Sequence, residues 1–216
     1  MISWQAVALV VVAYLLGSVP SAYLASKWLR GIDIREHGSG NVGGSNVWHT
    51  VAHWAVVPVG LFDVFKAALP TWAALVPLDL GYPVAVAAGL AAMAGHSWSV
   101  YLDCTGGRGL SCVLGTLLVV FPAGLVVESS LMLVGLLVRA EALLAWIGLL
   151  ALPWMSAALG EPAAVTWGCA GMLVLTAFKR LEANRRPVPH GLEGWKVLLR
   201  RLLLDRDVAS RREWES

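Results

Sequence analysis

The stretch ISWQAVALVVVAYLLGSVPSAYLAS, residues 2–26, has no charged residue and is long enough to cross a lipid bilayer as a helix. Further apolar segments follow it along the chain. Hydrophobic residues make up 58% of the 216 residues and charged residues only 14%, and the mean hydropathy is +0.70. A soluble domain has about a quarter charged residues. The composition therefore predicts an all-α, polytopic membrane helical bundle.

About seven membrane crossings are predicted from the apolar segments. The long apolar run 129–159 is interrupted by Arg139 and Glu141, which divides it into a short and a full segment. The short segment cannot cross about 30 Å of hydrocarbon as a straight helix, so it must recruit flanking residues or share its depth with a neighbouring helix. The predicted crossings are 2–26, 51–76, 81–102, 109–127, 129–138, 140–159 and 163–178.

The basic residues predict the orientation of the bundle. No Lys or Arg precedes the first segment, and ten of the sixteen follow residue 178. The positive-inside rule then places the N-terminus outside and the C-terminus in the cytoplasm, which requires an odd number of crossings. The first segment lacks a basic start and a small-residue cleavage site, so it is typical of an anchor rather than a cleaved signal.

This orientation puts the polar sequence on one side of a cell membrane. The connections on the opposite side, near 77–80, 128 and 160–162, contain no basic residue. The pattern fits an active site that faces the cytoplasm, and a basic inner rim without activity would look partly similar. The segments expected on the cytoplasmic side are 27–50, 103–108, the corner at Arg139 and the C-terminal tail.

The tail, residues 194–216, is predicted to be distinct from the membrane domain, residues 1–193. Apolar residues recur in it at helical spacing, with Lys and Arg between them. Such a helix can lie on the anionic inner leaflet or pack against the end of the bundle, and the sequence leaves both open. The apolar positions are Trp195, Leu198, Leu199, Leu202 and Leu203.

The segment DIREHGSGNVGGSNVWHT, residues 33–50, is the first candidate for a functional loop. Its glycines allow backbone N–H groups to converge on an anion, and its Ser and Asn side chains supply uncharged donors. It is not a Walker loop, because no lysine follows the glycines. An ordinary polar loop and an anion site both remain open on composition alone.

The segment GHSWSVYLDCTGGRGLS, residues 95–111, is the second candidate. Arg108 lies among three glycines at a predicted junction between a loop and a helix, an arrangement that suits phosphate. Arg108 could equally bind lipid headgroups from a tight connection. His96 is expected to hold the loop in place unless it meets a substrate.

Asp63 and Lys66 form a third candidate, because they lie three residues apart within an apolar segment. This spacing places both on one helix face. Charges at membrane depth are costly, so they face the bundle interior and mark either a site or a structural ion pair.

Several kinds of site are not indicated. The three cysteines, Cys104, Cys112 and Cys169, have no metal-binding spacing and are expected to serve in packing. The chain has no H-x-x-x-x-D relay, no G-x-S-x-G elbow and no H-E-x-x-H motif. No metal, cofactor or nucleic-acid partner is expected. Binding and positioning of anions is therefore the chemistry that the sequence favours.

Four segments, in this order, resemble the bacterial acyl-phosphate:glycerol-3-phosphate acyltransferases. They are GSVPSAYLASKWLRGIDIREHGSGNVGGSNV (17–47), FDVFK (62–66), AGHSWSVYLDCTGGRGLS (94–111) and NRRPVPHGLE (184–193). The resemblance implies an integral protein of the bacterial inner membrane with seven spans and cytoplasmic motifs. It also implies transfer of a fatty acyl group from acyl phosphate to the 1-hydroxyl of glycerol 3-phosphate, which gives 1-acylglycerol 3-phosphate and phosphate.

The resemblance also assigns roles to individual residues. It implies catalytic roles for Ser39, Asn41, His96 and Arg108. It implies substrate-binding roles for Gly40, Ser45, Asn46, Lys66, Gly106, Gly107, Gly109, Asn184 and Glu193. A substrate phosphate would take the hydroxyl proton, since no protein base stands out. Membrane lipids are the other expected partners, and the protein is expected to be a monomer.

The chain departs from the family pattern at several positions. His49 stands where the family usually has Arg, Ala142 where it has Ser, Leu181 where it has His, and Pro187 near the usual Arg, for which Arg185 or Arg186 could substitute. A non-catalytic or retargeted paralogue that binds an anionic lipid or another phosphorylated alcohol is therefore the alternative. A transporter is a further class, disfavoured by the one-sided polarity.

Overall fold

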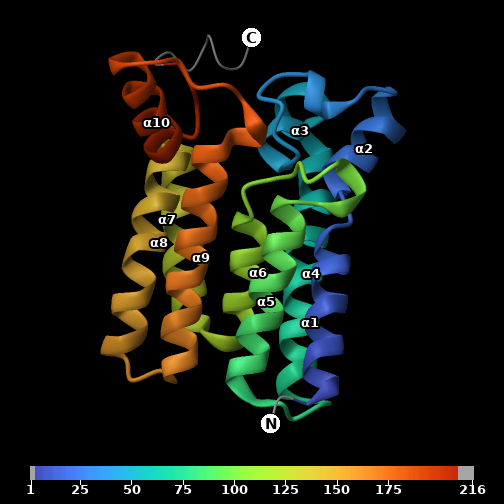
Figure 1. Cartoon of the computed structure of the whole chain (residues 1–216), viewed down its shortest axis with the longest axis vertical. Helices are drawn as coiled ribbons and strands as arrows, with labels where there is room; N and C mark the ends of the chain where they lie inside the picture. The colour runs from blue at the N-terminus through green and yellow to red at the C-terminus, as the bar shows by residue number, and fades with distance from the viewer. Residues whose placement is uncertain (1–2, 209–216) are drawn as a thin grey trace.

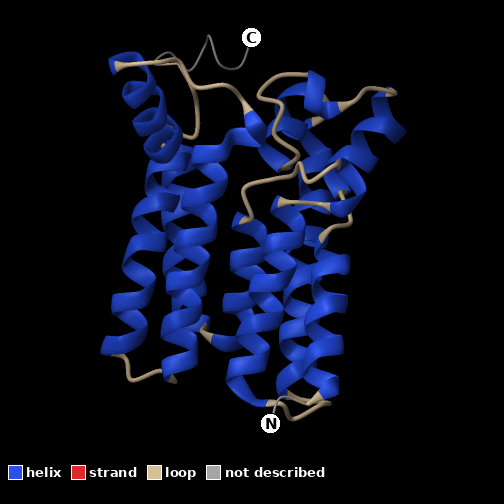
Figure 2. Cartoon of the chain, in the orientation of Figure 1, coloured by secondary structure: helices blue, strands red, loops and turns tan. Residues whose placement is uncertain are grey.

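The computed structural model describes residues 3–208, and these residues form helices joined by short loops (Figure 2). The predicted first segment begins one residue before this range, and residues 209–216 of the predicted tail lie outside it. No strand occurs between residues 3 and 208. The predicted all-α class is confirmed.

The helices divide into a bundle and a polar end (Figure 1). The bundle consists of α1 (Trp4–Gly17), α4 (Val56–Leu75), α5 (Gly81–Ser97), α6 (Leu110–Val120), α7 (Pro122–Val138), α8 (Glu141–Ala158) and α9 (Ala163–Glu182). At the end opposite the N-terminus lie α2 (Ser21–Arg30), α3 (Gly44–Thr50), α10 (Leu192–Leu204) and the short 3₁₀ turns η1 (Ile34–Glu36), η2 (His53–Ala55), η3 (Val100–Leu102) and η4 (Ala183–Arg185).

Three helical segments are long and apolar enough to cross a membrane by length and composition. They are Trp4–Arg30, His53–Leu75 and Glu141–Ala158, and α6 and α7 are shorter apolar helices. Aliphatic and aromatic side chains cover the outside of the bundle, including Phe65, Val126 and Leu137 at 63%, 63% and 75% exposure. Apolar side chains on the outside of a helical bundle are what contact with lipid tails requires.

The predicted first crossing, 2–26, falls almost entirely within the candidate span Trp4–Arg30, but two helices make up this span where a single helix was expected. The helix α1 ends at Gly17, and α2 begins at Ser21 after a break at Ser18–Pro20. Pro20 has no N–H to donate to an α-helix, and its ψ of 75° is not helical. The chain therefore turns at the polar end, where α2 leaves the bundle (Figure 1).

The predicted boundary at residue 128 is also wrong. The chain turns at Phe121, where φ and ψ are −154° and 73°, and Pro122 begins α7. The predicted crossings 109–127 and 129–138 are therefore a short α6 and a seventeen-residue α7. Glu128 lies inside α7 with its side chain fully buried beside Gly148 of α8, and the hydropathy pattern mistook it for a loop residue.

Other boundaries differ at the polar end. The helix α5 ends at Ser97 rather than 102, so that residues 98–109 form a connection beside the first loop. The helix α9 continues to Glu182, past the predicted end at 178. The predicted corner at Arg139 is confirmed, because Arg139 terminates α7 in a left-handed conformation with φ of 59°.

Small residues bring the helices of the bundle close together. A Cβ on Gly95 of α5 would collide with the Tyr14 carbonyl of α1, and one on Gly115 of α6 would collide with the Val64 carbonyl of α4. Helices in lipid gain stability from such close packing, because the lipid tails are as apolar as the side chains. The glycines thus fix how α1, α4, α5 and α6 pack together.

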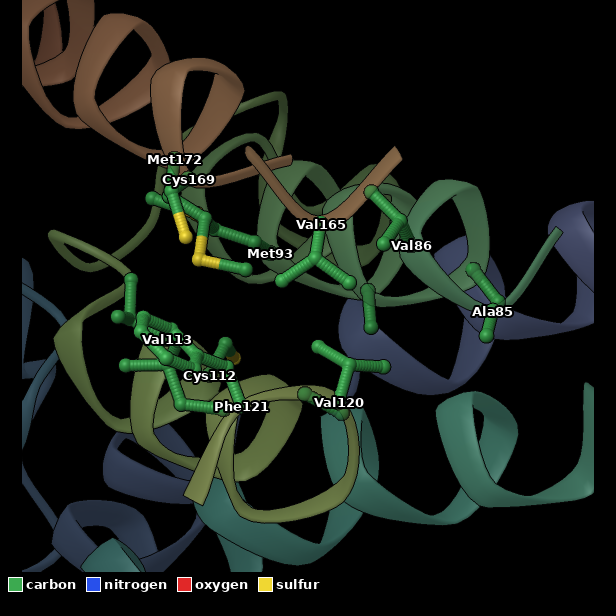
Figure 3. Close-up of a cluster of buried hydrophobic side chains, with 14 of the residues drawn as sticks. Ala85, Val86, Met93, Cys112, Val113, Val120, Phe121, Val165, Cys169 and Met172 are labelled. Carbon is green, nitrogen blue, oxygen red and sulfur yellow. The ribbon is translucent and has the colours of Figure 1, made fainter. Parts of the chain in front are cut away.

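A second layer of packing joins α9 to this group through side chains of α5 and α6 (Figure 3). Met172 and Cys169 of α9 lie opposite Val113 and Cys112 of α6. Cys112 and Cys169 are buried free thiols, as expected for packing. Cys104 instead lies in the 98–109 connection with φ of 58°, so the packing role expected for it is not a helical one.

The tail helix α10 packs against the ends of α8 and α9. It begins at Leu192, so the predicted domain boundary at 193/194 falls inside the helix. Val197 and Arg201 are buried on one face, whereas Leu192, Trp195 and Leu199 are exposed by 74%, 68% and 57%. The sequence left open whether this helix lies on the membrane or packs against the bundle. The buried face of α10 packs against the end of the bundle.

Candidate active site

Three polar connections converge at the end of the bundle opposite the N-terminus (Figure 1). The first glycine loop is Gly38–Asn46, the second glycine loop is Gly106–Gly109, and the third connection follows α9 at Ala183–Arg186. Hydrogen bonds of Asn184 and Arg186 link all three. The sequence segments that were predicted to carry the chemistry are therefore brought together in space.

The first glycine loop is organised by the side chain of Asn46. Its amide nitrogen donates towards the carbonyl oxygens of Ile34, His37 and Asn41 at 3.1, 3.0 and 3.1 Å, and its oxygen accepts from the Ser39 N–H at 3.3 Å. Asn46 is 2% exposed. Gly38 must be a glycine, because its φ is 56° and a Cβ there would lie 2.5 Å from the Asn46 oxygen. Asn46 thus shapes the loop and has little capacity left for a ligand.

The entry to this loop is held by Asp33. The Asp33 carboxylate accepts from the Arg35 backbone N–H at 3.0 Å and forms an ion pair with the Arg35 guanidinium at 2.7 Å. The hydrogen bond from Arg35 holds the pKa of Asp33 below its usual range. These contacts keep η1 in place in front of the glycines.

The other candidate side chains of the first loop are less occupied. The Ser39 hydroxyl accepts only a long hydrogen bond from the Asn41 N–H, at 3.4 Å, and the Ser39 carbonyl accepts from the Arg186 guanidinium at 2.7 Å. The Asn41 side-chain oxygen is buried without a hydrogen-bond partner among the described residues. Ser45 is exposed in the first turn of α3. Ser39, Asn41 and Ser45 therefore retain hydrogen-bonding capacity.

The second glycine loop is tied to α5 and to the third connection. The Gly107 N–H donates to the His96 carbonyl at 3.1 Å, and the Gly106 N–H donates to the Asn184 side chain at 3.2 Å. A Cβ on Gly107 would collide with Nε2 of His96. Gly109 has φ of 82° and precedes α6 directly, which places the loop at the α6 N-terminus.

Asn184 joins the two glycine loops. Its amide nitrogen donates to the Gly40 carbonyl at 3.4 Å and to the Gly106 carbonyl at 3.2 Å. Ala183, Asn184 and Arg185 all have positive φ values, of 46°, 55° and 63°. Three consecutive non-glycine residues in the left-handed region of backbone conformation are unusual. The conformational strain of this turn is offset by its contacts with both loops.

A buried polar cluster lies beneath the loops. The Lys66 ammonium is 2.7 Å from the Asp63 carboxylate, 2.8 Å from Nδ1 of His96 and 3.2 Å from the Val19 carbonyl, while Ser21 donates to Asp63 at 2.7 Å. Asp63 and Lys66 are each 2% exposed. A small pocket above this cluster is lined by Val19, Val42, Lys66, His96, Ser99 and Gly106.

The cluster sets the protonation of His96. An ammonium has three N–H donors and no acceptor, and the contacts of Lys66 use all three. Nδ1 of His96 is therefore the acceptor, so the neutral ring carries its proton on Nε2, the atom that faces Gly107. His96 thus offers a hydrogen-bond donor at the second glycine loop, and Lys66 contacts the other ring nitrogen, Nδ1.

Arg108 has acquired protein partners that the sequence did not indicate. Its Nε donates to the Asp205 carboxylate at 2.5 Å, and its terminal nitrogen donates to the Lys179 carbonyl at 3.2 Å. Arg108 is 9% exposed. Nothing in the spacing of Arg108 and Asp205, which lie 97 residues apart, predicted this pair.

Glu193 lies apart from this convergence. Its carboxylate pairs with Lys196 at 2.6 Å on the surface of α10, where its side chain is 62% exposed, and no hydrogen bond within residues 3–208 links it to either glycine loop. The hydrogen bond from Lys196 lowers the pKa of Glu193.

The divergent positions lie around the site rather than in the pocket. The Ala142 and Leu181 carbonyls accept hydrogen bonds from Arg180 and Arg201, at 3.1 and 3.0 Å. His49 and Pro187 are exposed. Of the two arginines expected to substitute near Pro187, Arg186 is the one that contacts the first glycine loop.

The fold and these contacts define a helical membrane protein with a polar site at one end of its bundle. Residues 7–187 match the family model described as "Glycerol-3-phosphate acyltransferase", so the chain belongs to this family and is an integral membrane protein with multiple helical spans. Glycerol-3-phosphate acyltransferase 5 of Dehalococcoides mccartyi (strain ATCC BAA-2266 / KCTC 15142 / 195) is 35% identical over 212 residues, covering 94% of this chain and 90% of the relative.

Other proteins show the same likeness. Glycerol-3-phosphate acyltransferase 4 of Dehalococcoides mccartyi (strain CBDB1) is 38% identical over 208 residues, which cover 93% of this chain and 89% of that one. The crystal structure of PlsY, an integral membrane glycerol 3-phosphate acyltransferase, in its glycerol 3-phosphate form superposes with a TM-score of 0.77 at 28% identity and covers 84% of this chain and 91% of that chain. Its lysophosphatidic acid form gives a TM-score of 0.74 at 27% identity.

Proposed function

We propose that this protein is a glycerol-3-phosphate acyltransferase that takes its acyl group from acyl phosphate and produces lysophosphatidic acid. The observation that carries the proposal is the junction of the two glycine loops through Asn184, above a His96 side chain whose Nε2–H faces Gly107. The family membership and the solved PlsY forms with glycerol 3-phosphate and lysophosphatidic acid support the acceptor and the product.

The reaction requires positioning more than protein acid–base chemistry. The 1-hydroxyl oxygen of glycerol 3-phosphate attacks the acyl carbonyl carbon, the bond from that carbon to the phosphate oxygen breaks, and phosphate leaves with the electron pair. The hydroxyl proton passes to a phosphate oxygen. Because His96 donates at Nε2, it stabilises developing negative charge and does not serve as the base. Holding both substrates in register can supply several kcal/mol of the barrier reduction.

The two loops divide the binding work. Ser39, Asn41 and Ser45 supply donors on the first loop, and the free N–H groups of the Arg108 guanidinium supply charge on the second. Asn46 and Asn184 shape and join the loops, and Lys66 orients His96. Glycines at 40, 106, 107 and 109 let the two loops pack closely against Arg186, His96 and Met93, which holds the loops in place around the site.

The orientation in the membrane follows from charge and aromatic residues. The polar end has the basic residues of α2, α9 and α10, so we place it in the cytoplasm, with α1 and α4–α9 crossing a bacterial inner membrane and the N-terminus outside. Exposed Trp4, Trp154 and Trp167 mark the opposite interface, at the start of α1, late in α8 and early in α9. The exposed Leu192, Trp195 and Leu199 of α10 then rest on the anionic inner leaflet.

The direct test is turnover by the purified protein. With palmitoyl phosphate and glycerol 3-phosphate, it should release lysophosphatidate and phosphate in equal amounts, measured by mass spectrometry and a phosphate assay, and palmitoyl-CoA should not replace the acyl phosphate. Arg108→Ala should lower kcat/KM by roughly a hundredfold, because it removes a charged donor. Lys196→Ala, on the exposed face of α10, is the matched control. Absence of product while a relative works in the same assay would refute the proposal.

A further inference from the structure

The C-terminal helix contributes a carboxylate to the second glycine loop. Asp205 terminates α10 in a left-handed conformation with φ of 52°, and its side chain reaches Nε of Arg108 at 2.5 Å. The Arg108 side chain is 9% exposed and that of Asp205 is 24% exposed. The family model ends at residue 187, so this contact comes from a segment beyond the part of the chain that it matches.

Asp205 is held at the end of a firmly attached helix. Arg201 donates to the carbonyls of Leu181 and Arg186, at 3.0 and 3.3 Å, and pairs with Asp207 at 2.7 Å. Arg180 donates to the Leu202 carbonyl at 2.8 Å from α9. The contacts of Arg201 and Leu202 with α9 and the connection after it anchor α10 just before Asp205, whereas the Arg201–Asp207 pair lies within the C-terminal segment itself.

The contact also leaves Arg108 able to bind a ligand. A guanidinium has five N–H donors in one plane, and two are used by Asp205 and the Lys179 carbonyl. Two fixed acceptors at different nitrogens determine the direction of that plane. Bidentate binding of a phosphate depends on this direction, because the two N–H bonds must point at two oxygens.

We propose that Asp205 is a positioning residue that orients the Arg108 guanidinium for substrate phosphate. This inference rests on the proposed acyltransferase function and assigns α10 a part in it. If Asp205 instead occupied the position of a phosphate, its removal would strengthen phosphate binding, and the two cases therefore predict opposite results.

The experiment compares Asp205→Asn with Asp207→Asn in the full-length protein. Both carboxylates lie just after α10, both side chains are 24% exposed and both pair with an arginine, but Asp207 pairs with Arg201 and not with Arg108. We expect Asp205→Asn to lower kcat roughly tenfold or more, as for a misplaced catalytic group. Asp207→Asn should stay within about twofold of the unmodified protein, since it leaves the Arg108 contact intact. An equal effect of the two variants, or none, would overturn the proposal.

Two further measurements keep the inference separate from the proposed function. In an Arg108→Lys background, Asp205→Asn should add little further loss, because the group that it orients is gone. Calorimetric titration with inorganic phosphate should show weaker binding to Asp205→Asn than to Asp207→Asn, even if the unmodified protein gives no turnover with acyl phosphate. Tighter phosphate binding to Asp205→Asn would overturn positioning in favour of competition.

Discussion

The two glycine loops are similar in composition but are held in different ways. The first loop is fixed mainly from within, since Asn46 binds the backbone of residues 34–41. The second loop has no such internal side chain among its described contacts. It is held by His96 of α5, Lys179 of α9, Asn184 of the connection after α9 and Asp205 at the end of α10. A loop of the first kind depends on local sequence, and a loop of the second kind depends on how the helices pack.

The largest expected effect comes from filling the space between the second loop and His96. In Gly107→Ala, the new Cβ collides with the His96 ring and lies 2.7 Å from the Val42 carbonyl. We expect activity to fall by about a hundredfold, because the loop and the donor at Nε2 are displaced together. Gly60→Ala in α4 is the matched control, since a Cβ there meets nothing within 4 Å. Equal turnover of Gly107→Ala and Gly60→Ala would contradict this expectation.

A smaller effect is expected from disturbing the first loop from within. Asn46→Asp keeps the oxygen that accepts from Ser39 but loses the donors to three carbonyls. Leaving these buried groups unpaired should cost about 1–3 kcal/mol of stability, measured as a lower melting temperature in detergent, with activity reduced about tenfold. Thr50→Val removes one local hydrogen bond to the Asn46 carbonyl and should cost less than about 1 kcal/mol. If the two variants have the same melting temperature, the first loop is not held by Asn46.

The smallest effect is expected at the joint between the loops. Asn184→Gly removes an amide that makes three hydrogen bonds of 3.2–3.4 Å and still permits the positive φ of 55°. We expect activity to fall about threefold to tenfold with little change in melting temperature, because each loop keeps its other contacts. Asn184→Ala should lose the same activity and about 1 kcal/mol of stability in addition, from the strained conformation. Full activity of Asn184→Gly would show that the loops do not need the joint.

Most residues of the candidate site could be predicted from the sequence, but the contacts between them could not. The sequence indicates the glycines, Ser39, Asn46, Lys66, His96, Arg108 and Asn184, and contacts in the structure gather them around the two glycine loops. Their relations were not indicated. Lys66 was expected to bind substrate, and its three donors instead go to Asp63, His96 and Val19. Asp205 carried no signal at all, because a single Asp after an amphipathic helix has no distinctive pattern.

The sequence by itself determined that the chain is a helical membrane protein with its polar loops gathered at one end. Hydrophobicity and the spacing of charges are local properties, and they indicate which segments are apolar enough to enter a bilayer. Only the tertiary structure decided that Arg108 meets Asp205 and that Asn184 joins the two glycine loops. The physical reason is that a buried charge or an unpaired carbonyl takes whichever partner the packed helices bring near, and that partner lies far away in the chain.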